Sequence, residues 1–192
     1  MSRATRILLL DDHSVVRAGI GAILAPEPDL ELVGAAGREG ELWPLLRETR
    51  PHVVVLDLHH PGRDGLSMAL RIGRRPDAPA LVLYTSHTDD ATVVAAALAG
   101  AGAVVNKSSP PDALLEAIRT VAGAPQMLPP VSLRMRREAA ARLDPPDRSI
   151  LALRLAGYAV GEIAETLRLP ARAVRDRLAA IIAGLEPVGT AQ

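Results

Sequence analysis

The chain has 192 residues, a formal net charge of zero and no cysteine. The missing cysteines exclude disulfide bonds and cysteine-based metal sites, and the balanced charge indicates no particular class of partner. Hydrophobic residues make up 48% of the chain, enough for the core of one large or two small domains. No signal-peptide pattern follows Met1, and no apolar run approaches the ~20 residues of a membrane span. We therefore expect a soluble cytoplasmic protein that contacts no membrane.

Five short runs rich in valine, leucine and isoleucine predict β-strands. Their apolar residues are nearly continuous rather than alternating, as in strands that are buried on both faces of a sheet. In chain order the predicted strands are Arg6–Leu10, Leu30–Ala36, Val53–Leu58, Ala80–Thr85 and Ala103–Asn106.

Helix-like segments follow each of these runs. They are Val15–Leu24, Glu39–Arg47, Gly65–Gly73, Asp90–Ala99 and Asp112–Val121. Strand and helix alternating five times predict an α/β fold with a doubly wound, five-stranded parallel sheet and right-handed crossovers.

The pattern changes at residues 123–130, where three prolines in eight residues disfavour both helix and strand. We interpret residues 123–142 as a linker that contains a helical stretch. Three short helices are predicted after it, at Asp147–Ala156, Val160–Leu167 and Ala171–Gly184, with a short turn between the last two. This arrangement is typical of a helix-turn-helix. We therefore expect a first domain at 1–122 and a small all-α domain at 143–192.

Charge is distributed unevenly between the predicted parts. Residues 1–122 carry 12 basic and 15 acidic residues, whereas residues 123–192 carry 10 basic and 7 acidic ones. An acidic first part and a basic second part favour two modules with different partners.

Polar residues stand at the ends of four predicted strands. Asp11 and Asp12 follow the first strand, Asp57 lies in the third, Thr85 ends the fourth and Lys107 follows the fifth. Ligands bind outside the carboxyl ends of the strands in open parallel sheets. If these strands are near neighbours, the five side chains converge on one site.

The carboxylates of this group predict a magnesium site. Three neighbouring carboxylates repel one another, and a hard divalent cation with oxygen ligands relieves that repulsion. We expect Asp12 and Asp57 to bind Mg²⁺ directly and Asp11 to act through water. The backbone carbonyl of His59 would complete the protein ligands.

The same residues suit phosphoryl transfer. A carboxylate such as Asp57 can form an aspartyl-phosphate, Lys107 can pair with phosphoryl oxygens, and Thr85 can donate its hydroxyl to them. One aspartate at a strand end is more often an N-cap, and a lone threonine or lysine there has no meaning. The complete set, in this order, favours the phosphoryl site.

The residues around this site resemble a bacterial response-regulator receiver domain. The matching segments are Leu10-Asp11-Asp12-His13, Val16-Arg17-Ala18-Gly19, Leu56-Asp57-Leu58, Pro61-Gly62, Asp64-Gly65-Leu66, Tyr84-Thr85, Ala97-Leu98-Ala99-Gly100-Ala101 and Lys107-Ser108. The resemblance covers residues 5–122, and its first motif is typical of the NarL/FixJ subgroup. It implies a flavodoxin-like fold, Mg²⁺, and phosphorylation of Asp57 by a sensor histidine kinase.

This sequence departs from the receiver pattern at several positions. His60 and Arg63 stand where the family usually has methionine. Val104 stands where it often has a tyrosine or phenylalanine that swings inward on phosphorylation. His59 and His87 flank the phosphoryl site, and we hypothesise that they set the phosphoryl lifetime and its dependence on pH. Their alternative role is that of ordinary exposed loop histidines.

The C-terminal residues resemble the LuxR-type helix-turn-helix that follows NarL/FixJ receivers. The matching framework is Leu143, Leu151, Leu153, Ala156-Gly157, Glu162-Ile163-Ala164, Leu167, Leu169, Val174, Ile181 and Leu185. Arg172, Arg175 and Arg177 lie near the start of the last helix. In a major groove they could contact base edges and phosphates. Their alternative role is that of a solvated helix face.

Several polar positions of the helix-turn-helix family are changed here. Val160 and Gly161 stand before Glu162, where the family has a lysine or asparagine that contacts DNA. Ala173 replaces a threonine, and Asp176 lies among the arginines. Arg168 replaces the turn glycine, and it would be strained if the turn requires a positive φ. Each lost phosphate contact weakens DNA binding and its salt dependence.

We therefore expect a two-component response regulator that acts on transcription. Phosphorylation of Asp57 would favour a homodimer that binds promoter DNA through the helix-turn-helix. The alternative is a regulator that acts through protein contacts and whose C-terminal domain no longer reads DNA. A haloacid-dehalogenase-like phosphatase is disfavoured, because His59 stands where its second aspartate should be.

Overall fold

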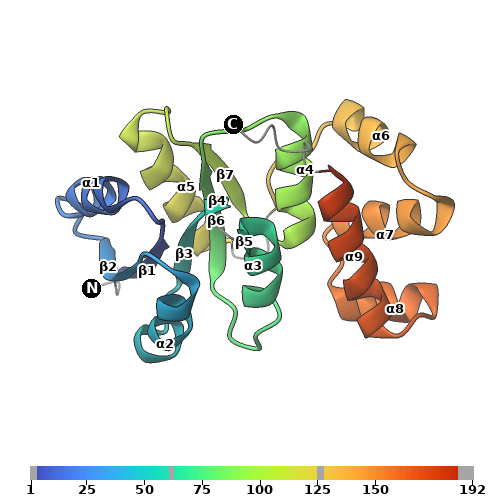
Figure 1. The fold of residues 1–192 in the computed structure, drawn as a ribbon, viewed down its shortest axis with the longest axis horizontal. Helices are drawn as coiled ribbons and strands as arrows, with labels where there is room; N and C mark the ends of the chain where they lie inside the picture. Colours follow the sequence, from blue (N-terminus) through green and yellow to red (C-terminus); the bar gives the residue numbers. More distant parts are fainter. Residues whose placement is uncertain (1–3, 61–62, 125–127, 186–192) are drawn as a thin grey trace.

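The computed structural model describes residues 4–60, 63–124 and 128–185. Its centre is a five-stranded parallel sheet with the strand order β2-β1-β3-β6-β7 (Figure 1). The strands are β1 (Thr5–Leu10), β2 (Leu30–Ala36), β3 (Val53–Asp57), β6 (Ala80–Thr85) and β7 (Ala103–Asn106). The predicted α/β fold is confirmed, and each predicted strand differs from the observed one by at most one residue.

A second, two-stranded sheet was not predicted. It consists of β4 (His59–His60) and β5 (Arg63–Asp64), which pair antiparallel directly after the strand that carries Asp57. Two-residue strands are too short to leave a period-two pattern in the sequence. The hairpin leads into helix α3 (Gly65–Ile72).

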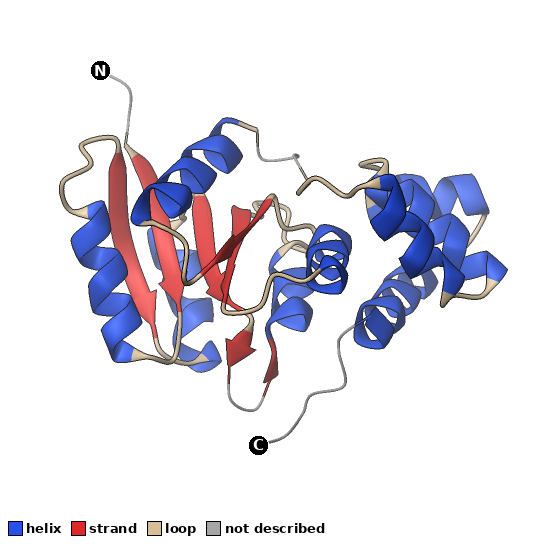
Figure 2. Cartoon of the chain, turned by 90° about the horizontal axis from the view of Figure 1, so that it is seen from above, coloured by secondary structure: helices blue, strands red, loops and turns tan. Residues whose placement is uncertain are grey.

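Helices cover both faces of the central sheet (Figure 2). Helices α1 (Ser14–Leu24) and α5 (Pro111–Gly123) share one core cluster with β1, β3, β6 and β7. Helices α2 (Glu39–Thr49), α3 and α4 (Asp90–Ala99) share the cluster on the other face. The central strand β3 is buried along its whole length, as its continuous apolar sequence predicts.

The C-terminal part consists of helices α6 (Leu133–Ala141), α7 (Pro145–Leu155), α8 (Val160–Leu167) and α9 (Ala171–Leu185). Helix α7 begins two residues earlier than predicted because proline is well tolerated in the first helical turn, here after Asp144. Gly157, which follows α7, has φ +94°, as a glycine at a helix end allows. Arg168 has φ 53°, so the expected positive φ at the turn between α8 and α9 is present on a residue with a side chain.

Helix α4 connects the sheet to the C-terminal helices. It contacts α6, α7 and α9 as well as α3 and β7, and it lies between the sheet and α9 (Figure 1). One continuous core cluster therefore extends from the sheet through α4 to α9. Between Thr92 and Ala99 the sequence of α4 contains only valine, alanine and leucine. A helix that is apolar all round is stable only when both of its sides are covered.

Two arginines of the C-terminal part hold the ends of α4. Arg134 of α6 forms an ion pair with Asp90 at the N-terminal end. Arg154 of α7 donates from Nε to the carbonyl oxygen of Leu98 at the C-terminal end, 3.2 Å away. The second contact places a cation at the negative end of the helix dipole.

Candidate functional site

The carboxyl ends of β1, β3, β6 and β7 bring the predicted site residues to one edge of the sheet. Asp11 and Asp12 follow β1, Asp57 ends β3, Thr85 ends β6 and Lys107 follows β7. Asp11 and Thr85 are 0% exposed and Asp57 is 2% exposed. Buried carboxylates need charged or polar partners, so this edge is a specialised polar site inside an apolar fold.

Lys107 joins two of the carboxylates. Its Nζ lies 2.7 Å from Asp11 Oδ2 and 2.8 Å from Asp57 Oδ2. Burial by itself lowers the pKa of Lys107, but the hydrogen bonds and charges of the two aspartates outweigh burial and raise that pKa above its ordinary value. The lysine is therefore charged at neutral pH and balances one of the two buried negative charges.

The remaining negative charge lies where a cation can bind. Ligand atoms of Asp11, Asp12, His13 and Asp57 all lie within 4.8 Å of one another. Asp12 Oδ1 is buried and accepts no hydrogen bond of good geometry among the described residues, although His13 Nδ1 is 2.8 Å away. Three carboxylates with a buried oxygen left to coordinate suit a hard divalent cation such as Mg²⁺.

Arg17 and His13 shape this acidic turn, and the sequence patterns did not identify either of them as a site residue. Arg17 Nη1 donates to the backbone oxygens of Asp11 and Asp12, at 2.8 and 3.1 Å. The backbone nitrogen of His13 donates to Asp11 Oδ1 at 2.8 Å. Their spacing in the sequence could have identified them. His13 directly follows the two aspartates, and Arg17 lies one helical turn after His13.

Two backbone N–H groups hold Thr85 in position, one after the neighbouring strand β7 and one in the loop that follows Thr85. The backbone nitrogen of Lys107 donates to its carbonyl oxygen at 2.8 Å, and the backbone nitrogen of His87 donates to its Oγ1 at 3.2 Å. His87 is exposed in the loop before α4. The side chain of His59 lies outside the described part of the structure, and its backbone begins β4. The proposed roles of both histidines therefore stay predictions.

Val104 lies on the edge strand β7 beside a hollow. The hollow has a volume of about 550 Å³ and is bounded by α4, β7, α5 and the segment Pro129-Pro130. Val93 and Ala117 contribute to its apolar wall. The small side chain of Val104 leaves this space open, where receiver domains often have an aromatic ring.

The three arginines predicted to contact DNA have different surroundings in the structure. Arg172 has a side chain that is 87% exposed and lies 3.7 Å from Asp176. Arg177 Nη1 lies 2.9 Å from Asp147 Oδ1 at the start of α7. Arg175 lines a cleft that faces the first domain. In this arrangement α9 is packed on α4, and of the three arginines only Arg172 is largely exposed to solvent.

Comparison with known proteins identifies the class. Residues 7–119 match the family model of the response regulator receiver domain. The chain therefore belongs to the response-regulator receiver family. The expected residues of the phosphoryl site lie inside the matched segment, whereas the three arginines of α9 lie beyond it.

Some relatives align with nearly the whole chain, and they specify the type of response regulator. The DNA-binding transcriptional activator DevR/DosR of Mycobacterium tuberculosis is 31% identical over 94% of this chain and 88% of its own length. The transcriptional regulatory protein LiaR of Bacillus subtilis is 32% identical over 94% of this chain and 90% of its own length. This chain is thus similar to NarL/FixJ-type regulators in both of its parts, as the sequence motifs indicated.

Solved structures show the same resemblance. A two-component response regulator of the LuxR family from Aurantimonas sp. has 34% identity and a TM-score of 0.61, covering 73% of this chain and 97% of that one. A structure of two RcsB dimers bound to two parallel DNAs has 23% identity and a TM-score of 0.62, and it shares the fold over 96% of this chain and 94% of its own. In the described ranges, no helix is long and apolar enough to cross a membrane.

Proposed function

We propose that this chain is a transcriptional response regulator that is switched by phosphorylation of Asp57. The observation that carries the proposal is the ion pair between buried Asp57 and partly buried Lys107, 2.8 Å apart, within the acidic cluster. A buried carboxylate next to a lysine and a cation site has the groups that phosphoryl transfer requires. The curated relatives, whose names describe transcriptional regulators, support the output.

The chemical step uses residues of this chain in separate roles. An Asp57 carboxylate oxygen attacks the phosphorus of a phosphohistidine on a sensor histidine kinase. The new O–P bond forms as the N–P bond breaks, and the departing imidazole takes up a proton. Lys107 then moves its ion pair from the carboxylate to a phosphoryl oxygen, and Thr85 donates its hydroxyl to another. Bound Mg²⁺, held by Asp12 and Asp57 with Asp11 behind them, would neutralise phosphoryl charge.

The output begins at Thr85. A new hydrogen bond from Thr85 to the phosphoryl group pulls on the loop that leads into α4, and α4 carries the C-terminal helices on its outer side. Phosphorylation would bias the packing of α9 on α4 and free the helix-turn-helix for DNA. A homodimer on two half-sites would then bring Arg172 and Arg175 to the DNA.

The input is tested on the whole protein with a small phosphodonor and Mg²⁺. We expect intact mass spectrometry to detect one phosphoryl group on the native chain and none on Asp57→Asn. Asp112→Asn is the control, because Asp112 is an exposed carboxylate at the start of α5 and does not belong to the acidic cluster. An equal adduct on Asp57→Asn would overturn the assignment of the acceptor.

A second function is favoured by the surroundings of α9. Arg177 is held by Asp147, and Val160 and Gly161 offer no polar side chain to a DNA backbone. The chain could therefore act through protein contacts instead. Gel-shift titrations against genomic fragments, with and without phosphodonor, distinguish the two functions. Binding that weakens steeply with salt supports transcription control, and a slope near zero supports the second function.

A further inference from the structure

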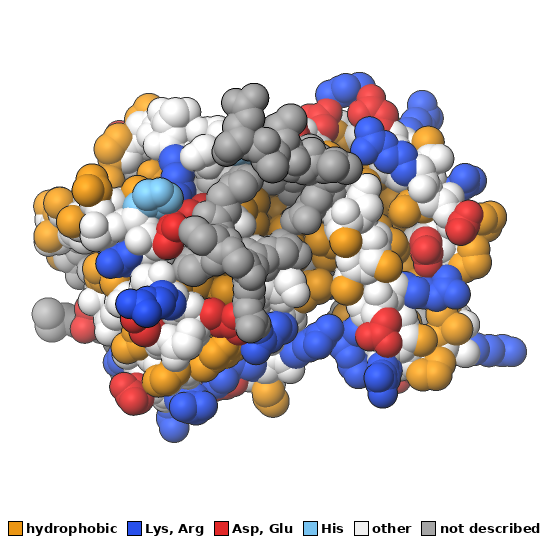
Figure 3. Space-filling model, in the orientation of Figure 1, with side chains coloured by type: hydrophobic (Ala, Val, Ile, Leu, Met, Phe, Trp, Pro, Cys, Tyr) orange, Lys and Arg blue, Asp and Glu red, His pale blue; other side chains and the backbone are white. Residues whose placement is uncertain are grey.

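A cleft between the two parts of the protein gathers arginine side chains. It has a volume of about 770 Å³ and lies among the segment after α3, the C-terminal end of α4, and helices α7 to α9. Arg74 comes from the first part, and Arg154 and Arg175 come from the C-terminal part. Basic side chains gather at this lower edge of the molecule (Figure 3), and those that line the cleft are all arginines. None of the described residues that line the cleft is a carboxylate.

Among the described residues, these three arginines have no acidic partner. Arg154 donates to two backbone oxygens, from Nε to Leu98 and from Nη1 to Tyr158, each at 3.2 Å. Burial of the guanidinium group lowers the pKa of Arg154. Arg74 and Arg175 form no ion pair with any residue in the described ranges. The cleft thus concentrates positive charge from both parts of the chain.

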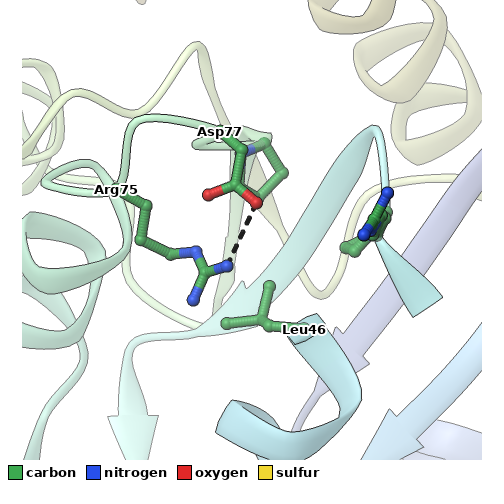
Figure 4. A pocket seen from close by; sticks show the side chains of 6 residues that line it. Leu46, Arg75 and Asp77 are labelled. Atoms are coloured by element: carbon green, nitrogen blue, oxygen red, sulfur yellow. Dashed lines mark hydrogen bonds and ion pairs between the residues drawn. The ribbon is translucent and has the colours of Figure 1, made fainter. Parts of the chain in front are cut away.

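A fourth arginine shows the contrast. Arg75 also borders the cleft, but its Nη2 lies 3.1 Å from Asp77 Oδ2 (Figure 4). That pair belongs to a separate hollow of about 330 Å³, which Leu46 and Arg50 also line. The charge of Arg75 is therefore neutralised by Asp77. The unbalanced charges are those of Arg74, Arg154 and Arg175.

Unbalanced like charges oppose the packing of the two parts. Guanidinium groups in a partly buried cleft repel one another more strongly than they would in water. An anion with several oxygens removes this repulsion and satisfies the planar donor forks of arginine, which match phosphate geometry. The side chains of Leu70, Leu81 and Val160 form an apolar wall beside the arginines. The cleft also lies within the range of about 300–1,000 Å³ that is typical of small-molecule sites.

We infer that this cleft binds a polyphosphate-bearing small molecule of nucleotide size, with its phosphates on Arg74, Arg154 and Arg175. The bound anion bridges the two parts of the chain and stabilises α9 in its place on α4. It also occupies Arg175, which the proposed transcriptional role assigns to DNA. The ligand would therefore oppose DNA binding, and DNA would oppose the ligand by the same factor.

The test is isothermal titration of the full-length protein with ATP and, separately, with inorganic triphosphate. Both titrations contain EDTA, so that no metal recruits phosphate to the acidic cluster. We expect one saturable site, and an affinity that falls about tenfold or more in Arg74→Gln and in Arg175→Gln, because each loses a charged hydrogen bond. Arg137→Gln is the matched control, since Arg137 is exposed on α6 away from the cleft. Its affinity should equal that of the native chain.

Two further arms make the result specific. Asp57→Asn should bind ATP as tightly as the native chain, because no residue of the phosphoryl site lines the cleft. This result separates the proposed ligand site from the proposed phosphorylation of Asp57. Tighter binding of ATP than of triphosphate would show that the apolar wall holds the base, and equal binding would identify the polyphosphate alone as the ligand. The absence of saturable binding, or equal losses in Arg137→Gln and Arg74→Gln, would overturn the inference. Circular dichroism of each variant checks that it is folded.

Discussion

The carboxyl edge of the sheet and the outer side of α4 are both buried, but opposite kinds of side chain fill them. At the sheet edge, Asp11 and Asp57 are held by Lys107 at hydrogen-bond distance. On α4, Val94 lies among the apolar side chains of α6 and α9. A polar site depends on each partner because a buried charge left alone is costly. An apolar interface depends on total contact, so it can open and close as a unit.

The largest effect is expected from breaking the polar site. Lys107→Met leaves two buried carboxylates without their cation, and the loss of one partner from a buried ion pair costs about 3–5 kcal/mol. Urea unfolding should show this loss without Mg²⁺ and a marked recovery when Mg²⁺ is added, because the ion supplies the missing charge. Equal destabilisation with and without Mg²⁺ would contradict the predicted metal site.

The α4 interface should respond to a charge in a different way. Val94 is 1% exposed, so Val94→Asp places a carboxylate in the apolar contact at a cost of several kcal/mol. We expect the C-terminal helices to leave α4 while the sheet stays folded. Because the chain has no cysteine, dyes on Glu116→Cys and Glu165→Cys can report the separation by energy transfer. Val15→Asp is the control, since Val15 is 82% exposed on α1. If Val94→Asp keeps the dye separation of the native protein, as Val15→Asp should, apolar contact does not hold the C-terminal helices on α4.

A smaller effect concerns the start of α4. Asp89 accepts from the backbone nitrogen of Thr92 at 2.7 Å as the N-cap, and Asp89→Ala should cost about 1 kcal/mol. The hydrogen bond lowers the pKa of Asp89 below its ordinary value of 3.8. Its stabilisation is therefore complete above that value and disappears as the pH falls through the lowered pKa. Unfolding free energies of both proteins should differ at pH 7 and converge in acid; a constant difference would contradict the cap.

The smallest effect is expected at the exposed ion pair between Arg134 and Asp90. Arg134→Gln should cost less than about 1 kcal/mol, because solvent screens a pair whose side chains are 69% and 43% exposed. The energy-transfer signal of the closed arrangement should change little, and less still at high salt. If Arg134→Gln separated the C-terminal helices from α4 as much as Val94→Asp does, charge rather than apolar contact would hold the two parts together.

Much of the fold could be predicted because its signals are local. The strand from Val53 is apolar on both faces, and helix α4 has the same range in prediction and structure. The hairpin that begins at His59 could not be predicted, since each of its strands has only two residues. The early start of α7 was missed because the breaking effect of Pro145 was weighed above its tolerance at a helix N-terminus.

The functional site, like the fold, has a part that the sequence predicts and a part that only the structure shows. The sequence alone determined which residues would meet, because each of Asp11, Asp57, Thr85 and Lys107 ends or follows a parallel strand and such ends lie on one edge. Only the tertiary structure decided that α9 packs on α4 and that Arg175 and Arg74 line the same cleft. Those contacts join segments far apart in the chain, and their partners are set by the shape and charge of surfaces that exist only after folding.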